Sequence, residues 1–291
     1  MRKLKLFTAA VVVAVISLFA VGCGLGDNSS NYGDMTWVIQ SNYDNVVSIT
    51  SIFDGVKTTK MMGSGVLVYK DGYIATNAHV ITLSTGNNNH RIADRVEIKF
   101  WSDAEYDGTW VYDTQDQADA LTRTVTLNYN QNNPNDPANE GVLYWDIHED
   151  IAILKCDDVP AGYENNYSVL RDSSPDHSPL KMGEPVAALG WSLGEMYSCS
   201  VGVVTSLEDE FKGTADGVDK DVYYAIFHDA RTIQGNSGGP LFDAQGRVIG
   251  LNTMIVYLNT TDDSVQTPGF DFSIAISSRT ILAKMKGLGI I

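Results

Sequence analysis

Cysteine is scarce in this sequence, with three among 291 residues. Cys156 and Cys199 lie in the body of the chain and could pair, or could be two small buried side chains in separate strands. No group of Cys and His residues has zinc-binding spacing, and His148-Glu149 lacks the second His of a helical zinc-protease motif. We therefore expect no metal and no cofactor.

Basic residues are also few, with 20 Lys and Arg against 36 Asp and Glu, which gives a formal net charge of −16. There is no basic stripe that could neutralise phosphates, so nucleic acid is excluded as a natural partner. A large negative charge is compatible with an exported protein that self-repulsion keeps soluble.

The one long apolar run, Leu6 to Val21, has 16 residues, whereas a spanning helix needs about 20. Three basic residues precede it, so residues 1–22 are predicted to be an export signal. The stretch Ala20-Val21-Gly22-Cys23 resembles a bacterial lipobox, which implies that Cys23 becomes a lipidated N-terminus on the membrane of the cell envelope. An ordinary signal peptide that contains a Cys is the alternative.

Polar, Gly- and Ser-rich residues from 23 to 35 are predicted to be a flexible tether, followed by one domain over 36–291. That domain contains many short strand patterns and little helix, which favours an all-β barrel architecture. Lys70-Asp71-Gly72 is a hairpin turn signal. One helix is expected at the end, with Ser278 as N-cap and Gly287 as stop, and Pro160 to Pro185 is expected to connect two halves. The expected strands are 46–49, 65–69, 73–76, 96–100, 125–127, 142–145, 151–154, 186–189, 201–206, 223–227, 241–242, 248–253 and 272–276.

The stretch Gly235-Asn236-Ser237-Gly238-Gly239-Pro240-Leu241-Phe242 places a serine between glycines, next to strand patterns. Such a turn exposes one hydroxyl together with backbone N–H groups, the combination that acyl transfer requires. The pattern also fits the nucleophile elbow of α/β-hydrolases, but that fold needs a His after the Ser. No His follows Ser237, so the α/β-hydrolase fold is excluded.

Two further motifs lie upstream of this serine. Thr76-Asn77-Ala78-His79-Val80 places His79 at the end of an apolar strand, and Asp150 opens the strand pattern Ile151 to Leu154. The order His, Asp, Ser is that of the chymotrypsin-type double β-barrel. Glu149 and Asp146 are alternatives to Asp150 as the carboxylate.

The three motifs resemble the signature blocks of HtrA-type, trypsin-like serine proteases, from about Val46 to the C-terminus. The resemblance implies a chymotrypsin/trypsin-like double β-barrel with a short C-terminal helix. It implies that Ser237 attacks a peptide carbonyl, His79 acts as the general base and Asp150 stabilises the imidazolium. The N–H groups of Gly235 and Ser237 would form the oxyanion hole. The expected function is that of an exported serine endopeptidase acting on unfolded or surface proteins. The alternative is a catalytically silent binding or chaperone module.

By the same resemblance, Arg231 and Thr232 would lie at the base of the pocket for the residue before the scissile bond. One wall of that pocket would come from Asn252, Thr253 and Met254. Arg231 could select an acidic substrate residue through a bidentate pair. It could equally pair with Asp229 or point to solvent.

The chain departs from the family pattern in residues 101–141, which we interpret as an insertion because His79 and Asp150 are 71 positions apart. The insertion could be a calcium loop, a lid beside the cleft or a solvated loop, and no spacing in it resembles an EF-hand. The length leaves no room for the PDZ domain that many HtrA-type enzymes carry. Family members often form trimers through N-terminal aromatic residues, a role that Trp37 or Tyr43 could fill.

Overall fold

A computed structural model describes residues 35–56, 61–86, 89–100, 121–130, 132–133, 136–193, 196–215, 218–257 and 271–291. The predicted export signal, the lipidation site Cys23 and the tether up to residue 34 lie outside these residues, as does the 101–120 part of the predicted insertion. Met35, the last residue of the predicted tether, is buried as the first residue of helix α2 (Met35–Asn42).

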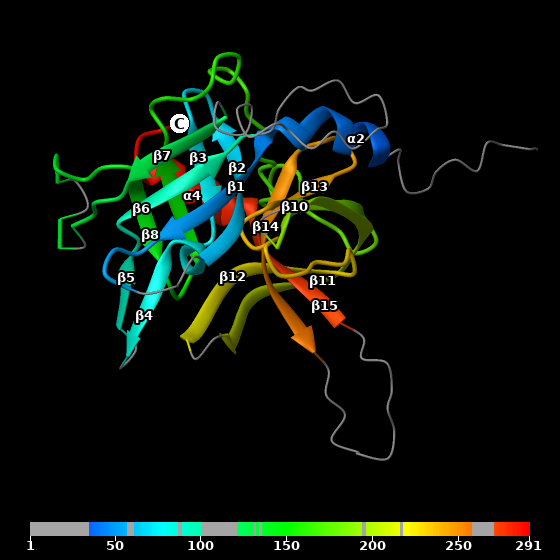
Figure 1. The fold of residues 1–291 in the computed structure, drawn as a ribbon. Helices are drawn as coiled ribbons and strands as arrows, with labels where there is room; N and C mark the ends of the chain where they lie inside the picture. The colour runs from blue at the N-terminus through cyan, green and yellow to red at the C-terminus, as the bar shows by residue number, and fades with distance from the viewer. Residues whose placement is uncertain are drawn as a thin grey trace, which may run out of the picture. The chain divides into compact units, whose positions relative to one another are not determined.

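The first half of the described chain forms a seven-stranded antiparallel sheet with the order β7-β6-β1-β2-β3-β9-β8 (Figure 1). The two ends of this sheet approach each other just beyond the edge strands β7 and β8. There, the N–H groups of Asn128 and Glu140 donate to each other's carbonyl oxygens at 2.9 Å. The sheet is therefore curved like a barrel. Its strands are β1 (Val46–Ile52), β2 (Met61–Tyr69), β3 (Tyr73–Thr76), β6 (Arg95–Lys99), β7 (Thr122–Thr126), β8 (Val142–Asp146) and β9 (Ile151–Lys155).

The second half forms a closed six-stranded barrel with the order β10-β11-β12-β15-β14-β13. Together, the two sheets confirm the predicted double-barrel architecture, and helix α4 (Ser278–Gly287) follows the last strand. The barrel strands are β10 (Pro185–Ser192), β11 (Met196–Ala215), β12 (Val218–His228), β13 (Pro240–Asp243), β14 (Val248–Tyr257) and β15 (Asp271–Ser277).

The predicted hairpin turn and the predicted helix cap lie at or next to the positions expected from the sequence. Asp71 and Gly72 have φ values of 62° and 80°, as a tight two-residue hairpin turn requires. The terminal helix is capped by the Ser277 hydroxyl, which accepts from the Arg279 N–H, so the cap lies one residue before the predicted Ser278. Helix α2 and the hairpin of β4 (Thr82–Gly86) and β5 (Asn89–Ile92) were not among the expected elements.

Strand β9 of the first sheet buries side chains on both faces, which is why Ile151 to Leu154 are all apolar. In β9, Ile151 and Ile153 belong to an apolar cluster that also contains Leu189 and Phe242 from the second barrel. The alternate residues Ala152 and Leu154 point into the core of the first sheet. Because side chains alternate along a strand, one face of β9 packs into the core of the first sheet. The other face packs into the apolar cluster that the two sheets share, which we call the seam cluster.

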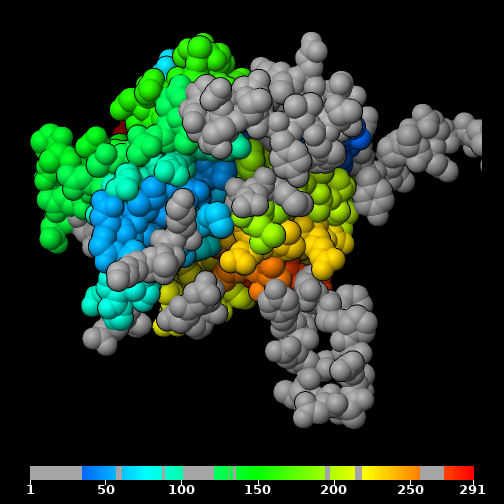
Figure 2. Space-filling view, viewed as in Figure 1, coloured from blue at the N-terminus to red at the C-terminus, as the bar shows by residue number. Residues whose placement is uncertain are grey.

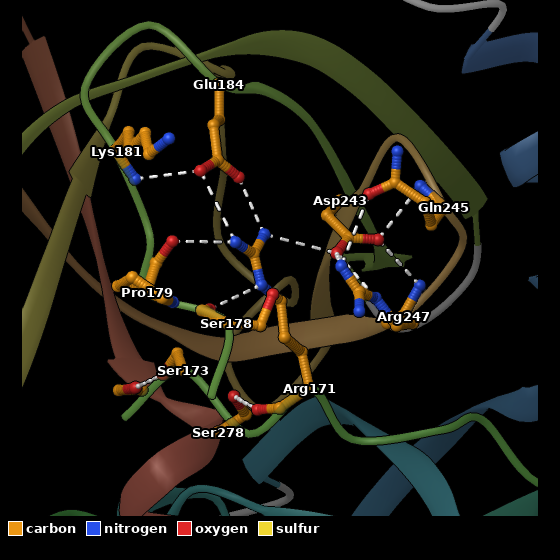
Figure 3. A network of polar contacts seen from close by, with 11 residues as sticks. Arg171, Ser173, Ser178, Pro179, Lys181, Glu184, Asp243, Gln245, Arg247 and Ser278 are labelled. Carbon is orange, nitrogen blue, oxygen red and sulfur yellow. Dashed lines mark hydrogen bonds and ion pairs between the residues drawn. The ribbon is translucent and has the colours of Figure 1, made fainter. Parts of the chain in front are cut away.

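Buried Arg171 anchors the connection between the two halves (Figure 3). Its guanidinium donates to both carboxylate oxygens of Glu184 at 2.6 and 3.3 Å, to Asp243 at 3.3 Å, and to the carbonyl oxygens of Ser178 and Pro179. All five of its N–H groups thus have acceptors, an arrangement that only a planar guanidinium provides. The connection predicted between Pro160 and Pro185 is therefore tied to the turn after β13.

Cys156 and Cys199 are both free in the structure, and no disulfide joins them. Cys156 is buried beside β9, as a small apolar side chain would be, whereas Cys199 lies exposed on β11. The sequence pattern could not distinguish a disulfide from two separate thiols, because it gives no distance between the two residues.

We predict that Arg171→Ala lowers the free energy of unfolding by about 3 kcal/mol, because it leaves the Glu184 carboxylate without this cationic partner and removes one of the two guanidinium groups that pair with buried Asp243. The matched control is Arg95→Ala. Arg95 pairs with Asp54 at 2.8 Å, but its side chain is 38% exposed, so the loss should stay below about 1 kcal/mol. Urea denaturation of both variants measures the difference, and equal losses would contradict this account of the network.

His228 on β12 is fully buried, and its burial lowers its pKa from 6.5 to about 4. The unfolded chain binds a proton there at a pH where the folded protein does not, so the folded state loses stability as the pH falls below 6.5. From pH 7 to 4.5 the loss attributable to His228 should be about 2 kcal/mol. Urea denaturation at both pH values should show a smaller loss for His228→Gln and an unchanged one for the exposed control His177→Gln. A His228→Gln variant with the wild-type loss would refute this.

Candidate active site

His79 lies in a short 3₁₀ turn, η2 (Ala78–Val80), directly after β3. Strand β3 pairs with β9 in antiparallel register, with Thr76 opposite Ala152. His79 follows β3 and Asp150 precedes β9, so both residues lie at the same end of the sheet. This pairing, rather than sequence proximity, brings together two residues that are 71 positions apart.

Asp150 holds His79 by two hydrogen bonds. The His79 backbone N–H donates to Oδ1 at 3.0 Å, and Nδ1 of the ring lies 2.8 Å from Oδ2. Asp150 is fully buried and has a φ of 57°, a backbone conformation that is uncommon for a residue with a side chain. The Asn77 side-chain amide stabilises it by donating to the Asp150 carbonyl oxygen at 2.9 Å.

The two alternative carboxylates have other partners. Asp146 accepts from the N–H groups of His148 and Glu149 and so caps the turn between β8 and β9. Glu149 accepts from the Tyr144 hydroxyl at 2.7 Å and pairs with Lys284 on α4 at 2.6 Å. Neither residue has a hydrogen bond to the His79 ring among the described contacts.

Two residues of the second barrel also contact the Asp150 carboxylate. The Lys220 ammonium on β12 donates to Oδ1 at 3.0 Å, and the Thr253 hydroxyl on β14 donates to Oδ2. Burial alone would raise the pKa of Asp150, but His79, Lys220 and Thr253 outweigh burial and hold it well below its usual range. The carboxylate is therefore ionised at neutral pH.

The turn that carries Ser237 is fixed to the first sheet through Ser64 on β2. The Ser64 N–H donates to the Ser237 carbonyl oxygen at 2.8 Å, and its hydroxyl donates to the Gly235 carbonyl oxygen at 2.7 Å. The same hydroxyl accepts from the Trp191 N–H at 2.8 Å. A single buried serine thus joins both ends of the turn to the other sheet.

Close backbone approach brings the serine turn to the strand that precedes His79. Gly238 has a φ of 82°, and a Cβ there would lie 2.2 Å from both the Ser64 carbonyl oxygen and Thr76 Oγ1. Only glycine fits these contacts without displacing backbone atoms. The His79 side chain is 24% exposed and Ser237 is half-buried. In the view of Figure 2, the blue and cyan surface of the first sheet borders the yellow and orange surface of the barrel.

Within this turn, the neighbouring amides differ in their hydrogen bonds. The N–H groups of Asn236, Gly238 and Gly239 donate to the carbonyl oxygens of Ile233, Asn252 and Asn236. The N–H groups of Gly235 and Ser237 have no acceptor among the described residues. The Ser237 hydroxyl likewise makes no hydrogen bond to the His79 ring in the described structure, and such bonds commonly form only when substrate is bound.

The predicted pocket residues differ in burial and in their hydrogen-bond partners. Thr232 is buried, and its hydroxyl lies 2.8 Å from that of Ser273 on β15. Arg231 is exposed, and no ion pair joins it to Asp229 among the described residues. Asn252 donates to the Gly239 and Pro240 carbonyl oxygens, and Met254 packs against the apolar seam cluster.

The described residues contain no group of His, Cys, Asp and Glu side chains that could hold a metal ion. Nor does any helix in the described ranges have the length and apolar character to cross a bilayer.

A family model for the trypsin-like peptidase domain matches residues 63–251, which include His79, Asp150 and Ser237. The chain belongs to the trypsin-like peptidase family. Among curated proteins, it is 29% identical over 205 residues to a probable periplasmic serine endoprotease DegP-like of Pseudomonas savastanoi pv. phaseolicola, covering 69% of this chain and 31% of that protein. It is 26% identical to the chloroplastic protease Do-like 1 of Arabidopsis thaliana, covering 94% of this chain and 52% of that protein.

Solved structures support the fold. The HtrA-type protease AlgW with tripeptide matches with a TM-score of 0.57 at 20% identity, covering 88% of this chain and 63% of that chain. The chain spans between about a third and two thirds of the length of these relatives. The likeness to the solved structure shows that the fold is shared.

Sequence reasoning missed two residues that this family member places around the site, Ser64 and Lys220. Ser64 lies between Gly63 and Gly65 in an otherwise apolar strand, and this pattern was a signal that could have marked a close approach. Lys220 carried no signal, because a lysine between two aspartates has the pattern of a solvated turn.

We predict that Ser64→Ala lowers the free energy of unfolding by about 2 kcal/mol, because it removes two hydrogen bonds of a buried hydroxyl, one from the Trp191 N–H and one to the Gly235 carbonyl oxygen. The control Thr85→Ala removes an exposed hydroxyl that donates to the Asn89 carbonyl oxygen and should cost at most about 0.5 kcal/mol. Urea denaturation compares the two variants. A Ser64→Ala variant as stable as the wild type would show that the serine turn is held by other contacts.

Proposed function

We propose that the protein is a serine endopeptidase that hydrolyses peptide bonds through Ser237, His79 and Asp150. The observation that carries this proposal is the buried Asp150 carboxylate, which lies 2.8 Å from His79 Nδ1 beside a serine turn that Ser64 joins to the same sheet. A carboxylate on Nδ1 leaves Nε2 of a neutral imidazole without a proton, as a general base requires.

In this mechanism, Ser237 Oγ attacks the peptide carbonyl while His79 Nε2 takes its proton. The imidazolium then gives that proton to the leaving amine, and an acyl-enzyme remains on Ser237. Water, deprotonated by the same nitrogen, releases the acid and restores the serine hydroxyl. Asp150 stays ionised throughout and stabilises the transient imidazolium.

The N–H groups of Gly235 and Ser237 serve as the oxyanion hole. The absence of an acceptor for either group among the described residues supports this assignment, since an oxyanion hole must offer donors without a competing partner. Removal of one such donor typically costs about 3 kcal/mol of transition-state stabilisation.

For specificity, we propose that Thr232, Asn252, Thr253 and Met254 line the pocket for the residue before the scissile bond. The hydroxyl pair of Thr232 and Ser273 supports a polar pocket floor. The exposure of Arg231 favours a solvent-facing guanidinium over one that selects an acidic substrate residue.

We propose export and attachment to the bacterial membrane through a lipid on Cys23, on the basis of the N-terminal sequence pattern. The periplasmic name of the Pseudomonas relative supports export. Protein or peptide chains are the substrates, including unfolded or surface proteins. We also propose a homotrimer through N-terminal aromatic residues, of which Trp37 is 43% exposed on α2.

We predict that Ser237→Ala lowers kcat/KM on casein-derived peptides at least about 10³-fold, because the nucleophile is absent. His79→Ala should do the same, while the control Ser174→Ala, on the connection between the barrels, should keep full activity. A fluorophosphonate probe should label the wild type and not Ser237→Ala, and a peptide-library digest reads the preferred residue.

A folded wild type that neither takes the label nor cleaves casein would overturn the peptidase proposal. It would favour the alternative, a catalytically silent binding or chaperone module.

A further inference from the structure

Lys220 is a charged residue with almost no contact with solvent. Its side chain is 3% exposed, and its ammonium donates to Asp150 Oδ1 at 3.0 Å and to the Ile147 carbonyl oxygen at 2.9 Å. Burial of an ammonium is costly unless it is paired and hydrogen-bonded. Both of its partners lie on the turn between β8 and β9, in the opposite sheet.

Lys220 lies on β12, near the tip of the hairpin of β11 and β12, and this tip reaches the β8–β9 turn of the first sheet. It contacts the β8–β9 turn through its backbone as well: the Asp221 N–H donates to the His148 carbonyl oxygen, and His148 Nδ1 lies 2.9 Å from the Asp219 carbonyl oxygen. Val218 packs with Ala78 and Ile147 in a small apolar cluster. These contacts fix the hairpin on both sides of Lys220, next to the residue that precedes His79.

Both oxygens of the Asp150 carboxylate have hydrogen-bond partners. Oδ1 accepts from the His79 N–H and from Lys220, and Oδ2 accepts from Thr253 and contacts His79 Nδ1. A carboxylate has about four lone-pair sites, and here each oxygen has two partners. Without Lys220, Oδ1 would retain one donor and the plane of the carboxylate would be less constrained.

We propose that Lys220 is a positioning residue of the catalytic triad, which orients Asp150 toward His79 and offsets part of its negative charge. This inference rests on the proposed peptidase function. Lys220 acts through Asp150 and does not contact the reacting atoms. It makes the triad depend on a hairpin of the second barrel, in addition to the serine turn.

The Lys220 charge should affect the His79 imidazolium in one direction only. With neutral His79, the Asp150–Lys220 pair has no net charge, so the imidazolium formed in catalysis faces a carboxylate whose field is partly cancelled. If the ammonium is removed, the imidazolium becomes more stable and persists to higher pH. The acidic limb of the pH–activity profile should therefore move upward in pH when Lys220 is neutralised.

The other charged groups near this point have partners of their own. Asp146 caps its own turn, Glu149 pairs with Lys284 on α4 and contacts Tyr144, and Asp221 lies 3.9 Å from Lys212. The titratable and charged groups of the elements around Asp150 are His79, Tyr144, Asp146, His148, Glu149, Asp219, Lys220, Asp221 and Lys284. Of these, His79 and Lys220 contact the Asp150 carboxylate.

The experiment compares Lys220→Met with Lys212→Met, a lysine of the same hairpin that is 67% exposed. For Lys220→Met we expect kcat/KM at its optimum to fall at least about tenfold, and the pH of half-maximal kcat/KM on the acidic side to rise by about one unit. Lys220→Arg, which keeps the charge, should leave that pH unchanged, as should Lys212→Met. An unshifted acidic limb in Lys220→Met would overturn the proposal, whatever the loss in rate.

A second measurement does not depend on activity. In the Ser237→Ala background, Asp150→Asn, Lys220→Met and their combination form a double-mutant cycle of melting temperatures. Each single change leaves a buried charge unpaired, so the double variant should melt at least about 5 °C above the value expected from adding the two losses. If Lys220→Met alone does not fold, a folded double variant still reports the coupling.

Additive melting temperatures would overturn the Lys220–Asp150 coupling. An inactive wild type with this coupling intact would overturn the peptidase function alone. An active wild type with an unshifted acidic limb in Lys220→Met would overturn only the role of Lys220.

Discussion

The buried carboxylate of Asp150 is the constraint on which the rest of the site depends. A fully buried charge is tolerated only when donors surround it, and here the donors come from both sheets. His79 belongs to the first sheet, whereas Lys220 and Thr253 belong to the second barrel. The site is therefore complete only when the two sheets are joined, and the donors from the second barrel, Lys220 and Thr253, also help to hold them together.

A second constraint is the closeness of the two backbones at the seam. Gly238 lies so near Ser64 and Thr76 that any side chain would collide with backbone and hydroxyl oxygens. Ser64 fills this contact with a hydroxyl and an N–H that reach both ends of the serine turn. The glycines around Ser237 thus serve two purposes: they permit the turn, and they allow the other sheet to approach it.

Much of this arrangement was predictable from local patterns. The short strands, the Asp71-Gly72 turn and the terminal helix were predictable because each signal is encoded within a few residues. The double barrel followed from the resemblance of the three motifs around His79, Asp150 and Ser237 to HtrA-type proteases. Helix α2 was missed because its residues are mostly weak helix formers, with Thr, Val and Ile among them. Its formation depends on Met35 and Val38 packing into the seam cluster, which is a tertiary effect.

The part of the site that escaped prediction has a common physical origin, which is contact between segments far apart in sequence. Lys220 lies between Asp219 and Asp221, a polar pattern typical of a solvated turn, yet its ammonium is buried because the hairpin of β11 and β12 extends to the β8–β9 turn. The hairpin is long because β12 pairs with β11 along its length. Its tip is held against the first sheet by the small apolar cluster around Val218. A lysine whose sequence neighbours predict solvent exposure thus donates to the carboxylate that binds His79. The residues that hold the proposed triad are therefore found from packing across the seam, even though His79, Asp150 and Ser237 stand out in their sequence motifs.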